Sequence, residues 1–538
     1  MNRHLITAAL PYANGPLHIG HIAGAYLSAD IYARYMRQKG EEVLFICGSD
    51  EHGTSIEILA KKLQKMPQEV VDQYHAVLRD TFENIGMSFD HYGRTSGKKH
   101  HTMAQEFFKK LHNDGQFEAR ESEQYYDETA QMFLADRYIR GECPHCGYAD
   151  AYGDQCEKCG TSLSADELIN PRSALSDSAP VKRKTTHWYL DLSAYQSWLE
   201  GWLAEDDKQK TWKKHVLGQC KSWLKEGLHP RSMTRDLSWG IPVPLPEADG
   251  KVLYVWFDAP IGYISATAEV VDDWQNWWQN PDTKLTHFIG KDNIVFHCII
   301  FPSMLKAHGD YILPVNVPAN EFLNLEGKKL STSRNHAVWG HEYLADFSDE
   351  NGNTEIAADM LRYCLTATMP EQKDNNFTWA EFQSRVNSEL VANIGNFIHR
   401  TLSLVHKYYA GDMPEDMILE TKVMTDIQKT KQGVEQFIEA HEYRKALNEL
   451  MEMSRIGNQY LTETEPWKLG EELAGSKLMI LGTCLKIVQE IQWSMQPFMP
   501  YAAERLKNLL KNMDQKPTPL FRKVEDEEIL AQQEGLQK

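Results

Sequence analysis

The opening stretch of the chain constrains the fold most, because it reads as one strand, one turn and one helix. Residues 5–10 (LITAAL) form an apolar run, Pro and Gly interrupt residues 11–16, and apolar side chains then recur at helical spacing. In a parallel sheet, such a unit presents free backbone N–H groups and the positive end of a helix dipole, where a phosphate binds. His18 and His21 lie at that end and can both face an anion. The alternative is a pair of surface histidines beside an ordinary turn.

Two later stretches repeat this arrangement of an apolar strand followed by polar side chains. Residues 43–47 precede Asp50 and His52, and residues 286–290 precede Asp292. Because the carboxyl ends of parallel strands meet at one edge of a sheet, we expect Asp50 and His52 to share a pocket with His18 and His21. The carboxylate of Asp50 can hold an ammonium group there, although it can also cap the helix that follows.

The order of the remaining elements predicts the architecture. Residues 252–258 read as a further strand and lead into a helix from residue 259, whereas the alternation of strands and helices becomes irregular after about residue 115. Strand signals disappear after about residue 380, and long amphipathic helical patterns replace them. We therefore predict an α/β fold in which an insert splits a Rossmann-type, doubly wound parallel sheet, followed by an α-helical bundle.

The insert carries the strongest local motif of the chain. Cys143 and Cys146 form one CxxC pair, and Cys156 and Cys159 form a second pair nine residues further on. A glycine follows each pair, and four thiolates in two such corners typically bind one tetrahedral zinc ion. A closed site of four sulfur ligands leaves no open position for catalysis, so we expect a structural Zn²⁺. A redox pairing is the alternative.

Two further segments have weaker signals. Residues 186–225 place tryptophans at helical spacing, which predicts core packing. These residues are Trp188, Trp198, Trp202, Trp212 and Trp223. Residues 326–335 form a basic, hydroxyl-rich loop whose Lys328, Lys329 and Arg334 can neutralise phosphate oxygens, although such a run is often only solvated surface.

Composition limits the class of partner. The 538 residues carry a formal net charge of −19, which argues against indiscriminate binding of nucleic acid but allows a local surface that reads one RNA. No stretch predicts a secretory signal or a membrane span. The cysteines outside the CxxC pairs stand alone, which is typical of a reducing compartment. We expect a cytoplasmic protein without membrane contact.

The C-terminal helices hold candidate RNA contacts. Asn396 and Arg400 are four residues apart and share one helix face, where they and the nearby Asn387 can read base edges. Trp467 follows a proline at the end of another helix, where its ring can stack on a base. The alternative is that these residues occupy ordinary surface or core positions and have no role in RNA binding. Residues 521–538 are acidic and predict a linker or frayed tail.

Taken together, the motifs resemble those of the methionyl-tRNA synthetases. They are residues 8–15 (AALPYANG), 18–21 (HIGH), 256–263 (WFDAPIGY), 288–292 (FIGKD), 329–333 (KLSTS) and the two CxxC pairs. HIGH and KLSTS stand where class I aminoacyl-tRNA synthetases carry their HIGH and KMSKS signatures, and the first and third motifs are specific to the methionine enzymes. The resemblance covers nearly the whole chain in the right order.

The resemblance implies a domain plan. It comprises a first Rossmann half (1–115), a connective insert with the zinc site (116–230), a second Rossmann half (231–325), a segment with the KMSKS-type loop that contacts the tRNA stem (326–380), an anticodon-binding helical domain (381–520) and the acidic tail (521–538). It also implies ATP-dependent ligation of methionine to its tRNAs, initiator and elongator, through a methionyl-adenylate, with Mg²⁺ on the ATP phosphates.

The resemblance also implies roles for individual residues. His18, His21 and Lys329 match the catalytic positions. Methionine-binding positions are Leu10, Tyr12, Asp50, Trp256, Ala259, Pro260, Tyr263 and His297. ATP-binding positions are Asn14, Gly20, His21, Asp292, Lys328, Lys329 and Arg334. Anticodon-reading positions are Asn396, Arg400 and Trp467.

One departure from the family pattern concerns the lysine loop. Thr332 stands where the signature has its second lysine, so Lys328, Lys329 or Arg334 must supply the phosphate contact. Two alternatives follow from the motifs: a catalytically silent tRNA-binding paralogue, and a class I synthetase for another amino acid, with cysteine as the leading candidate. The intact His18 and His21 argue against the first, and the closed four-cysteine set argues against the second, because recognition of cysteine by a metal needs an open coordination position.

Overall fold

A five-stranded parallel sheet forms the centre of the computed structural model, which describes residues 2–134, 138–153, 156, 158–159, 161, 163–332, 335–414 and 417–536. Its strands, in spatial order, are β14 (Ala319–Asn320), β13 (Thr283–Gly290), β1 (Arg3–Ala8), β2 (Glu42–Ser49) and β3 (His91–Arg94). The chain winds outward from β1 in one direction through β2 and β3, and β13 and β14 occupy the other side. The strand order therefore reverses between β1 and β13, which is where doubly wound sheets bind their ligands.

One continuous helix follows β1 and confirms the predicted strand–turn–helix unit. It comprises α1 (Ile19–His21), a π-helical segment η1 (Ile22–Tyr26) and α2 (Leu27–Gln38). Its buried apolar face packs under the sheet, and the chain turns away at Gly40, whose φ of 87° suits a residue without a Cβ. A π-segment one turn after the histidines fits the frequent occurrence of such bulges near functional sites.

The predicted strand over residues 252–258 is wrong for most of its length. Only β12 (Val252–Leu253) is extended, and it pairs with β11 (Thr234–Arg235) outside the central sheet. Helix α9 (Val255–Val270) begins earlier than predicted and is buried on nearly all sides. A helix that is apolar all round has no polar face to reveal its period, so a short window cannot distinguish it from a buried strand.

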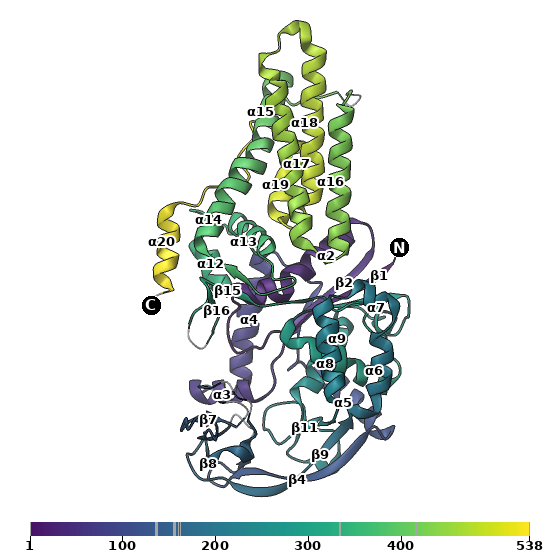
Figure 1. Ribbon diagram of the computed structural model, residues 1–538, viewed down its shortest axis with the longest axis vertical. Coiled ribbons are helices and arrows are strands. Elements are labelled where there is room, and N and C mark those ends of the chain that lie inside the picture. The colour runs from purple at the N-terminus through teal and green to yellow at the C-terminus, as the bar shows by residue number, and fades with distance from the viewer. Residues whose placement is uncertain are drawn as a thin grey trace.

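The insert forms its own layers at one end of the molecule (Figure 1). A long antiparallel pair, β4 (Phe117–Asp127) and β9 (Val181–Asp191), joins β5 (Met132–Phe133) and β10 (Pro230–Ser232). A second small sheet contains β6 (Ile139–Glu142), β7 (Ala151–Tyr152) and β8 (Ile169–Ser173). Helices α6 (Gln196–Leu203), α7 (Asp206–Thr211) and α8 (Lys214–Glu226) follow β9.

The prediction that the tryptophans of residues 186–225 pack in the core is only partly correct. Trp188, Trp202 and Trp212 are buried, as expected for core residues, but Trp223 is 38% exposed. Trp188 also lies on β9 rather than on a helix, so the apparent helical spacing across this segment was partly coincidental.

The remaining helices cover the sheet and build the C-terminal bundle. The first Rossmann half also contains α3 (Thr54–Leu63), α4 (Pro67–Ile85) and α5 (Lys98–Asn113), and the second contains α10 (Gln275–Trp278) and α11 (Phe301–His308). Strands β15 (Leu323–Leu325) and β16 (Lys328–Lys329) come next, followed by α12 (Gly340–Asp346) and α13 (Glu355–Ala367). Strand β17 (Asn375–Phe377) then returns to complete a small three-stranded sheet with β15 and β16, and α14 (Trp379–Arg385) follows it. The bundle contains α15 (Asn396–Tyr409), α16 (Thr421–Glu439), α17 (Tyr443–Thr464), α18 (Ala474–Met495) and α19 (Pro500–Lys511), and lies at the opposite end of the long axis from the insert (Figure 1).

The C-terminal segment differs from the predicted frayed tail. Residues Asp526–Gly535 form helix α20, which lies beside α12 and α14 (Figure 1). Val524 and Ile529 are buried, and Arg522 pairs with Glu528 at 2.8 Å. Two spaced apolar anchors hold this acidic segment in place, a signal too sparse for composition to reveal. Within the described residues, no helix combines the length and the apolar character needed to cross a membrane.

Candidate active site

His18 and His21 form a reciprocal cap at the start of the first helix. The backbone N–H of His21 donates to Nδ1 of His18, and the backbone N–H of His18 donates to Nδ1 of His21, both at 3.2 Å. The two rings stack with their centroids 3.5 Å apart. Because each Nδ1 accepts a hydrogen bond, each neutral ring carries its proton on Nε2.

The charge state of these histidines follows from their surroundings. Burial lowers the pKa of His18 to about 4, and burial together with the neighbouring His18 lowers the pKa of His21 well below its usual value. Both rings are therefore neutral at pH 7, and each offers one Nε2–H donor. The corner can donate hydrogen bonds to an anion without carrying a full charge of its own.

The lysine segment lies against this corner. A Cβ on Gly20 would lie only 2.5 Å from Cδ1 of Leu330, so the absence of a side chain at Gly20 permits the contact. Backbone hydrogen bonds join Ile19 to Val338 at 3.0 Å and Gly340 to Leu17 at 2.8 Å. The structure thus brings the two signature segments together.

The basic residues of that segment are exposed. Lys328 and Lys329 form β16 rather than a loop, and Nζ of Lys329 lies 5.3 Å from the ring of Phe322. Thr332 is exposed as well, whereas Arg334 lies outside the described residues. The expected loop therefore begins as the second strand of a β-hairpin.

Asp50 lies at the carboxyl end of β2, beside the end of β1. Its backbone N–H donates to the carbonyl of Pro11, and its carbonyl accepts from Ala13, both at 2.8 Å. The side chain is buried and does not cap α3, whose N-cap is Gly53. Burial raises the pKa of Asp50 well above its usual value, and the carboxylate of Asp258 raises it further. A cation is the natural partner for this carboxylate.

Aromatic and apolar side chains line the space next to Asp50. The rings of Tyr12 and Trp256 meet edge to face at 6.2 Å, and Trp256 stacks on Phe296 at 3.7 Å. Ala259 and Pro260 are buried on the same helix as Trp256. Leu10 packs so closely on that helix that a Cβ on Gly262 would lie 3.0 Å from its Cδ1.

A buried hydrogen-bonded pair lies deeper in this wall. Nε2 of His297 and the hydroxyl of Tyr263 are 2.9 Å apart, and Nδ1 of His297 lies 3.1 Å from the carbonyl of Asn293. A carbonyl only accepts, so Nδ1 donates to it and Nε2 accepts from Tyr263. Burial lowers the pKa of His297 to about 4, so the pair is neutral. The wall therefore suits an uncharged side chain.

Asn14 and Asp292 lie at the switch point between β1 and β13. Asn14 is exposed in the turn after β1, and Asp292 is exposed directly after β13. A Cβ on Gly290 would lie 2.6 Å from Oδ1 of Asp292, so Gly290 lets this carboxylate fold back over the strand end. Both side chains thus reach the edge that also carries the histidine corner.

Asp50 lies at the carboxyl edge of the sheet, as expected, but His52 does not face the histidine corner. Nδ1 of His52 lies 2.5 Å from Oδ2 of Asp258, and the ring of His52 packs near His101 and Trp239. Asp258 lies in the WFDAPIGY motif, but its position on a helix became visible only in the structure.

The four cysteines of the insert converge. All four Sγ atoms lie within 4.8 Å of one another, with Cys143 to Cys159 at 3.9 Å and Cys146 to Cys156 at 3.6 Å. Four sulfurs at about 2.3 Å from a tetrahedral zinc ion would be about 3.8 Å apart. The cluster is therefore compatible with zinc. Gly147 has the positive φ expected of a CxxC corner, whereas Gly160 lies outside the described residues.

Two of the three predicted RNA-contact side chains meet in the bundle. The guanidinium carbon of Arg400 lies 5.4 Å from the ring centroid of Trp467, which remains 37% exposed, and Asn396 is exposed one turn earlier on α15. Asn387 does not join them, because its side chain bonds both backbone groups of Val524 at 2.9 Å. It anchors the C-terminal segment instead.

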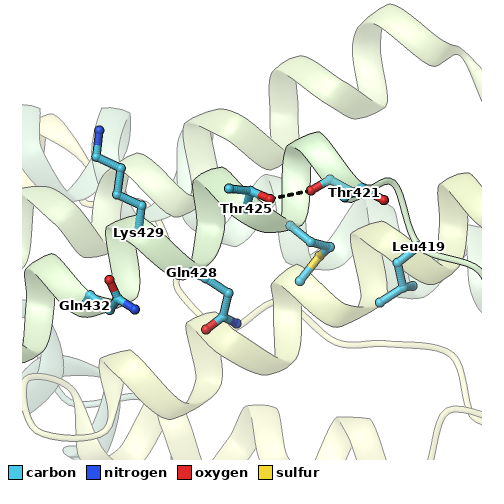
Figure 2. A pocket seen from close by; sticks show the side chains of 7 residues that line it. Leu419, Thr421, Thr425, Gln428, Lys429 and Gln432 are labelled. Carbon is cyan, nitrogen blue, oxygen red and sulfur yellow. Dashed lines mark hydrogen bonds between the residues drawn. The ribbon is translucent and has the colours of Figure 1, made fainter.

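Two cavities lie away from this edge. One, of about 630 Å³, lies along α16 and contains a single charged side chain, Lys429; Figure 2 shows Thr425 bonded to the carbonyl of Thr421 beside it. The other, of about 710 Å³, lies between α5 and the far side of α9. Neither cavity includes a residue of the histidine corner or Asp50.

A parallel sheet with these two signature segments at its switch point defines a class I aminoacyl-tRNA synthetase. Residues 4–402 match the family model "tRNA synthetases class I (M)", and residues 412–525 match "Anticodon binding domain of methionyl tRNA ligase". The chain belongs to the methionine–tRNA ligase family.

Individual relatives agree with this assignment. The methionine–tRNA ligase of Bacteroides fragilis is 54% identical over 557 aligned positions, covering 99% of this chain and 81% of that protein. That of Parabacteroides distasonis is 55% identical and covers 94% and 74% respectively. A crystal structure of Mycobacterium tuberculosis methionyl-tRNA synthetase bound by methionyl-adenylate has the same fold, with a TM-score of 0.78 at 21% identity over 97% of this chain and all of that one.

Proposed function

We propose that the edge formed by β1, β2 and β13 joins methionine to ATP and passes the methionyl group to tRNA. The chain is an ATP-dependent methionine–tRNA ligase that works through a methionyl-adenylate. The observation that carries the assignment of the site is the meeting of two half-sites at one edge. One is the buried Asp50 with its aromatic wall, and the other is the histidine corner with the lysine strand.

The methionine half-site recognises both ends of the amino acid. The carboxylate of Asp50 receives the ammonium group, and the wall of Leu10, Tyr12, Trp256, Ala259, Pro260, Tyr263 and His297 receives the thioether. Sulfur–aromatic contacts contribute about 0.3 to 1.5 kcal/mol each, and a missing methylene costs about 1 to 3 kcal/mol. Discrimination against shorter aliphatic side chains is therefore moderate.

The phosphate half-site stabilises charge rather than moving protons. The methionine carboxylate is already ionised at pH 7, so it attacks the α-phosphorus without a general base and pyrophosphate leaves. His18 and His21 donate from Nε2 to the phosphate oxygens, where negative charge builds. Lys328, Lys329 and Arg334 neutralise the leaving group, and Asn14, Gly20 and Asp292 hold the nucleotide. Mg²⁺ on the phosphates supplies further charge neutralisation.

The insert carries a structural zinc site. Cys143, Cys146, Cys156 and Cys159 would hold the ion, and their spacing fits its tetrahedral geometry. Replacing Cys143 by Ser is expected to reduce the zinc content of the purified protein from one equivalent to near zero and to lower the melting temperature. His145, which is exposed between two ligands, offers a matched control, because His145→Ala should retain the metal. Full zinc retention in Cys143→Ser contradicts the site.

The helical bundle reads the anticodon through Asn396, Arg400 and Trp467. An exposed indole beside a guanidinium group supports this role, because unstacked bases bind aromatic faces and hydrogen-bonding edges.

The proposed domain boundaries are those that the resemblance implies, except that residues 526–535 form the packed helix α20. The single cysteines are all free, which supports a cytoplasmic location.

One assay tests the proposed reaction. ATP–pyrophosphate exchange is measured with each amino acid in turn, and exchange is expected with methionine far above all others. Exchange that prefers cysteine, or tRNA binding without exchange, contradicts the assignment and supports one of the two alternatives instead.

A further inference from the structure

A buried group of ionisable side chains lies behind Asp50. Asp258, His52 and His100 are each at most 1% exposed. His52 Nδ1 lies 2.5 Å from Oδ2 of Asp258, and His100 Nε2 lies 3.9 Å from the same oxygen, too far for a hydrogen bond. Oδ1 of Asp258 has no hydrogen-bond partner among the described residues. Such an acceptor is costly to bury, so its retention calls for an explanation.

This group connects both sides of the methionine half-site. Asp258 lies in the first turn of α9, the helix that also carries Trp256, Ala259 and Tyr263. His52 lies two residues after Asp50, and its backbone nitrogen is 3.5 Å from Oδ1 of Asp50. The bond between His52 and Asp258 therefore ties the end of β2 to the apolar wall.

The charges of the two carboxylates are coupled. Burial opposes ionisation of Asp258, but His52 and His100 offset burial and hold the pKa of Asp258 below its usual value. The resulting negative charge is the second cause, after burial, of the raised pKa of Asp50. Two coupled buried carboxylates favour the binding of an added cation.

We propose that Asp258 is a positioning residue that acts through His52 and Asp50 to select the ammonium group of the amino acid. This inference rests on the proposed role of Asp50 as the ammonium-binding carboxylate. Its negative charge adds to that of Asp50, and its bond to His52 holds Asp50 at the correct depth beside the wall. The remaining acid of this segment, Glu51, is already paired with Arg94 at 2.9 Å and does not share this role.

Binding of three ligands to the whole chain, monitored by intrinsic tryptophan fluorescence, tests the proposal. The ligands are L-methionine, L-methioninol, which keeps the ammonium but lacks the carboxylate, and 4-(methylthio)butanoate, which lacks the ammonium. Asp258→Asn is expected to weaken methionine and methioninol about tenfold, equivalent to about 1.4 kcal/mol, and to leave the third ligand within about twofold. Glu269→Gln, the same change further along α9, is the matched control and should leave all three unchanged.

Other outcomes separate this inference from the proposed function. Equal weakening of all three ligands by Asp258→Asn, or no weakening at all, overturns it. Asp50→Asn must also lose the preference for ammonium; if it does not, the proposed role of Asp50 fails and the inference fails with it. If Asp258→Asn does not fold, His52→Ala is expected to show the same selective loss, whereas His52→Asn, which keeps a donor at the Nδ1 position, should restore the preference. Failure of that rescue also overturns the inference.

Discussion

The two halves of the proposed catalytic edge differ in how deeply their polar side chains are buried. In the methionine half, Asp50, Tyr263 and His297 are 3%, 2% and 5% exposed, and buried hydrogen bonds hold the polar atoms of Tyr263 and His297. In the phosphate half, the two histidines are only partly buried and Lys328 and Lys329 are exposed. One half is built around buried side chains, whereas the other presents partly buried and exposed donors.

This difference reflects what each half must recognise. Methionine is small and carries few features, so in the proposed site discrimination depends on the apolar wall and on one buried carboxylate that binds the ammonium group. Triphosphate carries several negative charges, so exposed donors suffice to bind it. The histidine corner stands between these cases, because its reciprocal backbone bonds fix the Nε2–H tautomer while the rings remain accessible.

The largest expected effect comes from the histidine corner. His21→Ala removes one fixed donor to the transition state and also one half of the reciprocal cap. The rate of ATP–pyrophosphate exchange at saturating methionine is expected to fall about 10² to 10³-fold, or about 3 to 4 kcal/mol. His341→Ala, an exposed histidine outside the corner, is the control. Near-normal exchange by His21→Ala contradicts the proposed phosphate half.

The second prediction concerns Trp467, which lies in the helical bundle outside both halves of the edge. Trp467→Ala is expected to reduce kcat/KM for methionine tRNA by a factor equivalent to about 1 to 3 kcal/mol of transition-state free energy, which is the contribution of one base stacked on an aromatic ring. The rate of ATP–pyrophosphate exchange should not change. Trp223→Ala is a matched control, since Trp223 is 38% exposed and Trp467 is 37% exposed. An unchanged preference for the methionine anticodon removes Trp467 from the RNA-binding surface.

The third prediction concerns pH. The pKa of Asp50 is raised in the free protein, but an ammonium ligand favours its ionised form, so binding of methionine releases a proton. Affinity should therefore fall as the pH drops below the raised pKa, by about tenfold per unit, while methionine itself keeps a constant charge. Fluorescence titrations at several pH values check this. A slope that persists in Asp50→Asn assigns the dependence to another group.

The smallest expected effect ranks two residues of the lysine segment. Lys329→Ala removes one exposed charged contact to the phosphates. Because a hydrogen bond to a charged group contributes about 1.5 kcal/mol, adenylate formation should slow about tenfold. Thr332→Ala should change the rate less than twofold, roughly 0.4 kcal/mol, because an exposed threonine carries no charge. Single-turnover rates with saturating ATP give the ranking, and the reverse order contradicts the phosphate contact of Lys329.

The carboxyl edge of the central sheet could be predicted from the sequence better than the buried helix α9 and its contacts. The unit around His18, the strand before Asp50 and the CxxC pairs each depend on local order, which the chain displays directly. The helix at Asp258 was misassigned because its apolar residues surround it on all sides, and the pairing of His52 with Asp258 was hidden because 206 residues separate them.

The C-terminal segment illustrates the same limit. Its acidic composition suggested a frayed tail, yet α20 packs through Ile529 and bonds to distant side chains such as Asp346, which accepts from Gln532 at 2.7 Å. Long-range partners of this kind cannot be inferred from local composition.

We propose that the methionine half binds its ligand without help from the phosphate half. Equilibrium binding of methionine in the absence of ATP tests it most directly, with His21→Ala and Asp50→Asn measured side by side. His21→Ala is expected to bind methionine as the unmodified protein does, whereas Asp50→Asn is expected to bind it at least about tenfold more weakly, a difference of about 1.4 kcal/mol. Equal loss in both variants, or a loss confined to His21→Ala, would contradict it.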